Sequence, residues 1–461
     1  MRVCLRSAIV VLAAASVTST PNLAAEEQPP AQTATSAPQS AMTNEVEQLK
    51  KQNAELQSRV DKLAGELDLI KNQLTDTPTA KLRPLSGKKS ATSSLDVEIY
   101  GYVKLDAAYD SSHVSVGNYA RWVESEQTVK NDSEFNMTAN ETRVGVRVRG
   151  PETDNFRSSG NVEIDFYGGG SENAAFPRLR QANLNFEWPN AGFGVLAGQA
   201  NDVISPLWMP RVNFSPGWWQ GNIGFRRPQL RLTENVKLAD GVELKFEAAA
   251  ARTIATSFTT PKDSFFDPGA DAGYPTAQGR VSVTFPGFAR LPITIGASGH
   301  WGRENHSFNF TNGTQVISFT TWSGNADLTL PFTPWLTFRA EAYFGSDLDS
   351  YLGGIGQGIN TTLLVPIFDR GGWGAVTLGP FGKWTFNLGY GLDSVRLSDV
   401  PANADPTKDA RVSNWVAFGN VYYSLTPNLQ LALEISRLRT TYKSVAPGDD
   451  WRAQFAVIYK F

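Results

Sequence analysis

The sequence predicts an all-β fold: an antiparallel transmembrane β-barrel of about sixteen strands, preceded by an N-terminal α-helical coiled coil. Three observations predict it. Hydrophobic residues recur with a period of two in successive short runs from residue 95 to residue 461. The connections between these runs alternate between short turns and long loops. Before the first run, residues 45–75 carry a heptad repeat.

The segment before the coiled coil is predicted to be a secretory signal followed by a leader. Residues 1–25 place an apolar run after Arg2 and Arg6 and end on small residues at Ala25, which is typical of a signal peptide. Its removal changes the formal charge from −3 to −3 − 2 = −5 and takes away Cys4, the one cysteine. Residues 26–44 are rich in Ala, Gln, Pro, Thr and Ser, and we expect them to be disordered.

The heptad segment is predicted to associate with copies of itself. Its apolar stripe is confined to the a and d positions, which favours self-association over packing on a single domain. Asn53 at an a position would fix the register, but the stripe leaves open whether two or three helices associate. Residues 76–94, with two prolines, are interpreted as a linker. The predicted seam residues are Val46, Leu49, Asn53, Leu56, Val60, Leu63, Leu67, Ile70 and Leu74.

The barrel is predicted over residues 95–461. The alternating runs are 95–110, 141–150, 161–167, 178–188, 193–199, 224–233, 242–252, 279–285, 293–301, 316–330, 335–344, 371–378, 384–393, 412–424, 429–440 and 451–461. Long loops are expected at 111–139, 168–177, 200–223, 253–277, 302–315, 345–370, 394–410 and 441–450. A soluble β-sandwich has no reason to alternate long and short connections in this way, so two unlike membrane sides are the better interpretation. The coiled coil would then lie on the short-turn side, in the periplasm.

The last run predicts the strand that closes the barrel. In 451–461 the odd positions are apolar or aromatic, and Arg452, Gln454 and Lys460 fall on the other face. The run resembles the closing strand of an outer-membrane barrel. This resemblance implies that Phe455, Tyr459 and Phe461 form the signal read by the barrel-assembly machinery. An even strand count makes this run antiparallel to 95–110, its predicted partner.

Composition is consistent with a barrel and argues against other classes. The mean hydropathy is −0.27, and after the signal no run of ~20 apolar residues could form a spanning helix. A barrel needs apolar residues on only one face of each strand. The net charge gives no global basic field, so nucleic acid is not an expected partner. Bilayer lipid is the expected environment of the outer wall.

The candidate binding residues are charged side chains on the inward parity. Arginine offers a forked set of donors that suits carboxylate or phosphate, so we expect the pore to prefer small anionic solutes. For each residue the alternative is a structural role, in which arginine and acidic side chains of the barrel wall form ion pairs with one another. The candidates are Arg143, Arg147, Arg149, Arg227 and Arg231, with Glu163 and Asp165 of opposite sign.

The third long loop, 200–223, is unusually apolar for a solvent-facing segment. It contains Trp208, Trp218 and Trp219, three prolines and one charge pair, Asp202 with Arg211. We interpret it as folded into the barrel, narrowing the channel and placing Arg211 near Arg227 and Arg231. Packing against a neighbouring protomer is the alternative.

The sequence offers little support for an enzyme. No Ser or Cys motif accompanies the three histidines, and no metal-ligand spacing is present, so no catalytic residue, cofactor or metal is predicted. The glycine-rich segment 353–358 follows no buried strand and is interpreted as loop sequence. A barrel hydrolase and a structural tether that engages peptidoglycan through the coiled coil are the alternatives from other classes.

Four segments together resemble a known family. They are Val162–Gly169, Pro177–Ala182, Gly194–Gln199 and Asn387–Asp393. Behind a periplasmic heptad segment, they are similar to the DcaP-like trimeric outer-membrane porins, over nearly all of 45–461. The resemblance implies a sixteen-stranded homotrimer that imports small anionic organic compounds, dicarboxylates or aromatic acids, with the inward arginines as the selective element. Phosphate- and pyrophosphate-selective porins are similar in appearance and remain an alternative.

Overall fold

The computed structural model describes residues 96–128, 132–150, 152–169, 175–256, 269–401, 403 and 409–461. The predicted signal peptide, leader, coiled coil and linker lie outside these residues. The described strands are β1 (Asp96–Asp110), β2 (Glu134–Thr138), β3 (Arg143–Arg149), β4 (Arg157–Asp165), β5 (Arg178–Trp188), β6 (Phe193–Asn201), β7 (Arg226–Ala239), β8 (Val242–Ala251), β9 (Thr276–Pro286), β10 (Pro292–Phe310), β11 (Gly313–Thr333), β12 (Leu336–Ser346), β13 (Ile359–Asn360), β14 (Val365–Pro366), β15 (Phe368–Phe381), β16 (Trp384–Val395), β17 (Arg411–Ser424), β18 (Leu429–Tyr442) and β19 (Gly448–Lys460). Short 3₁₀ turns lie at Ala270–Ala272, Phe288–Arg290, Asp349–Tyr351 and Gly354–Gly356.

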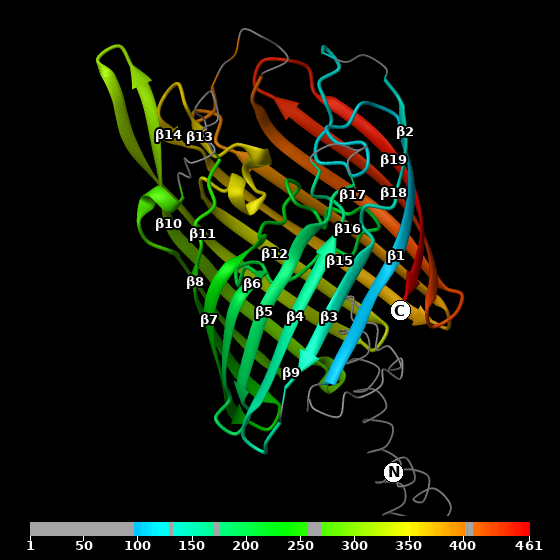
Figure 1. The fold of residues 1–461 in the computed structure, drawn as a ribbon. Coiled ribbons are helices and arrows are strands. Elements are labelled where there is room, and N and C mark those ends of the chain that lie inside the picture. The colour runs from blue at the N-terminus through cyan, green and yellow to red at the C-terminus, as the bar shows by residue number, and fades with distance from the viewer. Residues whose placement is uncertain are drawn as a thin grey trace, which may run out of the picture. The chain divides into compact units, whose positions relative to one another are not determined.

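The strands close into one antiparallel barrel (Figure 1). Seventeen strands form the sheet, and β2 and β3 share one position because both pair with β1, which gives sixteen barrel strands. The predicted closure is confirmed: β1 pairs with β19 from Tyr102 opposite Lys460 to Asp110 opposite Arg452. This pairing joins the first and last strands and leaves no open edge between them. Among the described residues, no helix has the length and hydrophobicity needed to span a bilayer.

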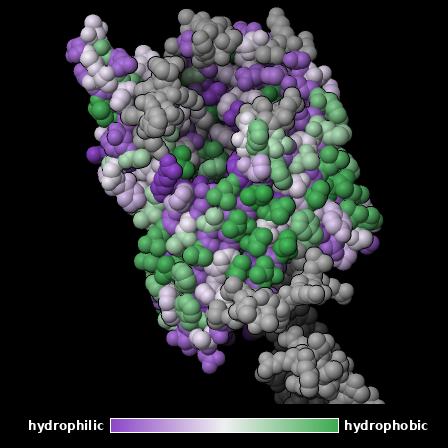
Figure 2. Space-filling view, in the orientation of Figure 1, coloured by the Kyte–Doolittle hydropathy of each residue, from purple (hydrophilic) through white to green (hydrophobic). Residues whose placement is uncertain are grey.

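The period of two in the sequence separates two faces of the wall. Apolar side chains on the outward parity are exposed although they are large, and Figure 2 shows hydrophobic side chains gathered over the strands and hydrophilic ones at the upper rim. Polar side chains on the inward parity are buried. Outward examples are Val97, Ile99, Leu105, Val146, Leu184, Leu232, Leu388, Leu433 and Phe455; inward ones are Lys104, Asp106, Asp165, Glu341, Asn420, Glu434 and Gln454. This inside-out pattern is the one expected of a wall that faces lipid.

Two strand predictions need correction. The second predicted run, 141–150, is only the lower part of its strand, because the chain bends at 139–142 and β2 continues the pairing with the upper part of β1. The predicted loop 302–315 is instead mostly strand. There, β10 and β11 pair as far as Phe310 opposite Gly313, beyond the last pairings of their neighbours at Trp301 and Trp322. This two-stranded ribbon carries polar residues on both faces, so its sequence lacks the alternation of the wall.

Short and long connections still define the two ends of the barrel. Turns such as 189–192, 240–241 and 382–383 lie at one end, here called the short-turn end. Loops such as 202–225 and 347–367 lie at the other, the long-loop end. The 202–225 segment, called the inner loop below, is the element that positions the candidate site.

Candidate functional site

The inner loop lies inside the barrel, as its composition predicts. Its backbone and side chains bond to inward-facing groups on several strands: the Leu207 amide donates to Glu341 of β12 at 2.8 Å. The Val212 carbonyl accepts from Lys104 of β1 at 2.7 Å. Because these partners belong to strands on different sides of the wall, the loop reaches across the lumen and leaves less open cross-section.

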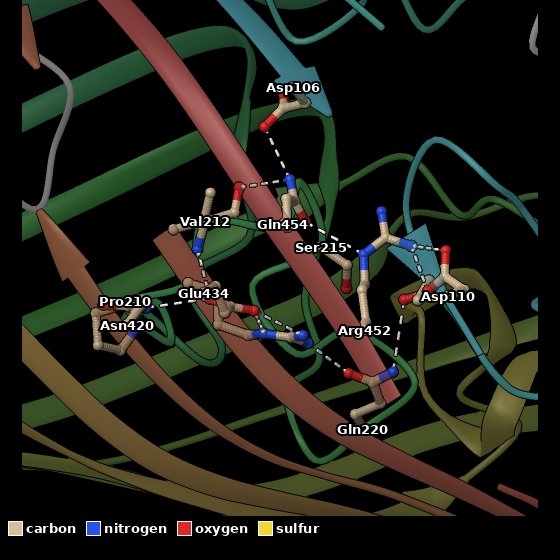
Figure 3. A network of polar contacts seen from close by, with 12 residues as sticks. Asp106, Asp110, Pro210, Val212, Ser215, Gln220, Asn420, Glu434, Arg452 and Gln454 are labelled. Atoms are coloured by element: carbon tan, nitrogen blue, oxygen red, sulfur yellow. Dashed lines mark hydrogen bonds and ion pairs between the residues drawn. The ribbon is translucent and has the colours of Figure 1, made fainter. Parts of the chain in front are cut away.

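One carboxylate, that of Glu434 on β18, holds the middle of the inner loop (Figure 3). It accepts bonds from the Arg211 guanidinium at 3.1 and 3.0 Å, from the Val212 amide at 2.7 Å and from the Asn420 amide at 3.1 Å. Burial lowers the pKa of Arg211, and the attraction of Glu434 opposes that shift. An arginine stays cationic in either case, so the contact is a buried ion pair.

An aromatic cluster fixes the rest of the inner loop to two other loops. Phe214, Trp218 and Trp219 pack with Trp122 of the first long loop and Ile355 of the glycine-rich segment. Trp219 and Trp122 meet edge to face, with ring centroids 6.3 Å apart. The segment 353–358 therefore is loop sequence, as predicted, and is folded inward against the inner loop. Three loops act as one packed unit at the long-loop end.

Arg211 does not join Arg227 and Arg231, contrary to the prediction. It binds Glu434 on β18, whereas Arg227 and Arg231 lie on β7, which is separated from β18 by several strands in either direction around the barrel. Arg227 is fully buried, 2.8 Å from Asp202, with its guanidinium 3.8 Å from the centre of the Tyr351 ring. Composition could show that the loop folds inward, but not how far across the lumen it reaches.

The arginines of β3 have the predicted inward parity and differ in exposure. Arg143 is buried, 5.4 Å from the centre of the Tyr102 ring. Arg147 lies 3.2 Å from Glu98, and Arg149 lies 2.9 Å from the same carboxylate. Arg149 is more than half exposed at the short-turn end. Arg147 and Arg149 are thus paired across the β1–β3 ladder, and Arg143 faces the interior above them.

A basic cluster gathers where β5 and β7 begin. Arg178 and Arg180 on β5 bind the predicted candidates Glu163 and Asp165, with contacts of 2.7 to 2.9 Å. Arg226 on β7 lies within electrostatic range of Arg143, Arg178 and Arg180. We call Arg143, Arg178, Arg180 and Arg226 the arginine cluster; three carboxylates act on its four cations, namely Glu163, Asp165 and, at Arg143, Glu141.

Arg226 has no hydrogen-bond partner for its two terminal nitrogens within the described part of the chain, although only 3% of the residue is exposed. Its guanidinium instead lies near aromatic rings, 4.6 Å from the centre of Phe225 and 5.9 Å from that of Trp218. A buried guanidinium with free donors is costly unless an acceptor completes it. The two nitrogens are closed off from solvent, so an acceptor can reach them only after the surrounding side chains move.

Sequence reasoning missed Arg178, Arg180 and Arg226. The β4–β5 ladder contains a bulge, in which Arg180 is the extra residue on β5 and has no partner on β4. Across this bulge, Arg180 and Gln181 do not follow the simple alternation of inward and outward side chains. Alternation from Arg227 places Arg226 on the outer face, and only the packing of the inner loop shows it to be buried. The sequence did carry a signal for Arg178 and Arg180: two arginines two positions apart at the start of a strand lie on the same face.

A cavity of about 260 Å³ lies between the inner loop and the β7–β9 wall. Its strand side is formed by Arg231, Lys245, Glu247 and Arg280. Glu247 lies 3.0 Å from Lys245, 3.3 Å from Arg280 and 3.8 Å from Arg231. One carboxylate thus serves three cations, although Arg280 also binds Asp327 at 2.7 Å. The cavity lining is thus the second place where several cations gather, together with the carboxylates of Asp202 and Glu247.

No protein-family model and no curated protein matches the chain. The closed sixteen-stranded barrel is the fold of outer-membrane channels. It is similar to the outer-membrane channel DcaP of Acinetobacter baumannii, with a TM-score of 0.63, 19% identity, and coverage of 82% of this chain and 100% of that chain. It is also similar to an anion-selective porin from Comamonas acidovorans, with a TM-score of 0.50, 12% identity, and coverage of 80% and 100%. The resemblance to DcaP-like channels is confirmed at the level of the fold.

Proposed function

We propose that this protein is an outer-membrane porin for passive, downhill diffusion of small anionic organic solutes, dicarboxylates or aromatic acids, and that it is not an enzyme. The observation that carries the proposal is the arginine cluster, in which Arg226 presents free donors beside three other arginines. Forked guanidinium groups suit the two oxygens of a carboxylate. A local excess of fixed cations also raises the concentration of anions beside it.

The proposed path runs from the long-loop end, past the packed loops, to the short-turn end of the barrel. Arg231, Lys245 and Arg280 line the cavity beside the inner loop, and Arg178 lies at the edge of the arginine cluster with about a quarter of its side chain exposed. Arg227 and Arg211 are buried in ion pairs and serve to hold the loop. The fold similarity to an anion-selective porin supports this assignment and does not identify the solute.

Two measurements on the purified protein test the proposal. In planar bilayers with a KCl gradient, we expect a reversal potential of the sign given by chloride preference, because cations outnumber carboxylates locally in the arginine cluster. In liposome swelling, we expect dicarboxylates and aromatic acids to enter faster than neutral sugars of equal mass. Cation preference would overturn the proposal, and faster entry of phosphate or pyrophosphate than of dicarboxylates would favour the phosphate-selective alternative.

We also propose that the protein is a homotrimer, held by contacts between barrel walls and by the heptad segment 45–75. Deletion of 45–75 is expected to lower the temperature at which the detergent-solubilised oligomer dissociates, because the apolar a and d positions would no longer be buried. Light scattering gives the mass and its loss on heating. Deletion of 26–44 is the matched control, since it shortens the same region and keeps the heptads. A monomeric full-length chain would contradict the proposal.

A further inference from the structure

Three potential metal ligands meet where the first long loop leaves and rejoins the wall. His113 follows β1, Asp132 lies two residues before β2, and Glu134 is the first residue of β2. One ligand atom from each lies within 4.8 Å of the other two. The His113 Nδ1 atom is 2.6 Å from a Glu134 oxygen and 3.8 Å from an Asp132 oxygen. Their spacing is small enough for one ion to contact all three.

The His113 Nδ1 atom has no hydrogen-bond partner among the described residues and is inaccessible to solvent. Its near neighbour is a Glu134 oxygen at 2.6 Å, which forms an ion pair with the imidazole only when the ring is protonated. A buried polar atom of this kind requires an explanation, because desolvation without a partner costs free energy. A metal ion that shares the imidazole and the carboxylates would supply the missing partner.

Backbone contacts hold the ligands in place. The His113 carbonyl accepts from the Glu124 amide at 3.0 Å, and the Val114 amide donates to the second Glu134 oxygen at 3.2 Å. Glu134 is also paired with Asp110 in the β1–β2 ladder. Asp110 is itself a buried carboxylate, bound to Arg452. The position is therefore both fixed and acidic, as a cation site requires.

We propose that His113, Asp132 and Glu134 bind a divalent transition-metal ion, with Zn²⁺ as the representative ion. One imidazole and two carboxylates with room for water is a ligand set that Zn²⁺ accepts. Ca²⁺ and Mg²⁺ prefer oxygen ligands alone, so the imidazole argues against them. This site lies outside the arginine cluster and the inner cavity, and it does not depend on the proposed transport function.

Binding there would tie together the two ends of the first long loop. That loop carries Arg121 and Trp122, and the Arg121 guanidinium lies 4.3 Å from the centre of the Trp122 ring and 5.5 Å from that of Trp219. The Arg121 carbonyl also accepts from Gln220 at 2.9 Å and from Asn414 at 2.7 Å. An ion at the base of the loop would thus stabilise one of the three segments packed inside the barrel.

Isothermal titration of Zn²⁺ into the tag-free, detergent-solubilised protein tests the site. We expect one strong site per chain, with affinity at least about ten-fold weaker in His113→Ala and in Glu134→Gln, because each loses a ligand. Glu152→Gln is the matched control, since it removes a carboxylate that pairs with Arg157 at the short-turn end. Zn²⁺ should also slow hydrogen exchange at residues 114–128 in the wild type but not in His113→Ala.

Three results of these experiments would contradict the proposed metal site. Wild-type protein that binds no Zn²⁺, ligand variants that bind as tightly as Glu152→Gln, or a site that takes Ca²⁺ in preference to Zn²⁺ would each overturn the proposal. None of these readouts involves conduction, so a failure here leaves the test of anion preference untouched, and the reverse also holds.

Discussion

A Glu434→Gln protein is expected to conduct in fluctuating steps that include a level above that of the wild type. The substitution removes the charge that pairs with Arg211 while keeping the shape of the side chain. Breaking a buried ion pair from one side costs about 3–5 kcal/mol, because the remaining charge is left without compensation. A loss of about 3 kcal/mol changes the ratio of seated to released loop by about 100-fold. Single-channel recording measures the occupancy of the higher level.

Two further variants distinguish two explanations of such currents: release of the inner loop, and the loss of one charge from the lumen. Glu187→Gln removes an exposed carboxylate on the inward parity of β5 at the short-turn end and leaves the inner loop contacts intact, so it should shift conductance without adding steps. Combining Glu434→Gln with Arg211→Met removes the unpaired cation, and we expect it to recover part of the lost stability. Steady currents from Glu434→Gln that match those of Glu187→Gln would show that the loop does not depend on this carboxylate.

The barrel could be predicted because its signal is local. Whether a side chain faces lipid or lumen is decided by its parity within one strand, and in 451–461 the exposed Trp451, Phe455 and Tyr459 alternate with the buried Arg452 and Gln454. The even strand count then made closure against β1 the consistent choice. The ribbon of β10 and β11 escaped prediction because no lipid face imposes alternation beyond the wall.

The candidate site was less accessible to sequence reasoning because its contacts are between distant parts of the chain. Arg211 and its partner Glu434 are 223 positions apart, and their pairing depends on how the inner loop crosses the closed barrel. The position of Arg226 could not be predicted for two reasons. Its parity on β7 indicates the outer face, and its neighbour Trp218 is placed beside it only by the fold of residues 202–225. Parity therefore identified the inward face of each strand, while the contacts that shape the site come from the loops.

Replacing Arg226 and Arg178 by glutamine is expected to remove most of the preference for anions. A fixed charge ~8 Å from a passing ion, at an effective dielectric constant of ~40, contributes about 1 kcal/mol, which is about a five-fold change in relative permeability. The double variant should lower the chloride-to-potassium permeability ratio by about 25-fold if the two charges act independently. Arg226 should contribute more than Arg178, because Arg178 already binds Asp165 at 2.7 Å whereas both terminal nitrogens of Arg226 lack an acceptor within the described residues.

Reversal potentials in a KCl gradient give the ratio, and Arg157→Gln is the control, since Arg157 is more than half exposed and pairs with Glu152 near the short β3–β4 turn. Circular dichroism and oligomer mass confirm that each variant is folded. A Lys245→Gln arm decides between the two basic regions: Lys245 lines the cavity beside the inner loop and leaves the arginine cluster intact. If Lys245→Gln lowers the ratio and folded Arg226→Gln does not, anions are selected in the cavity, and the free donors of Arg226 have no part in selection.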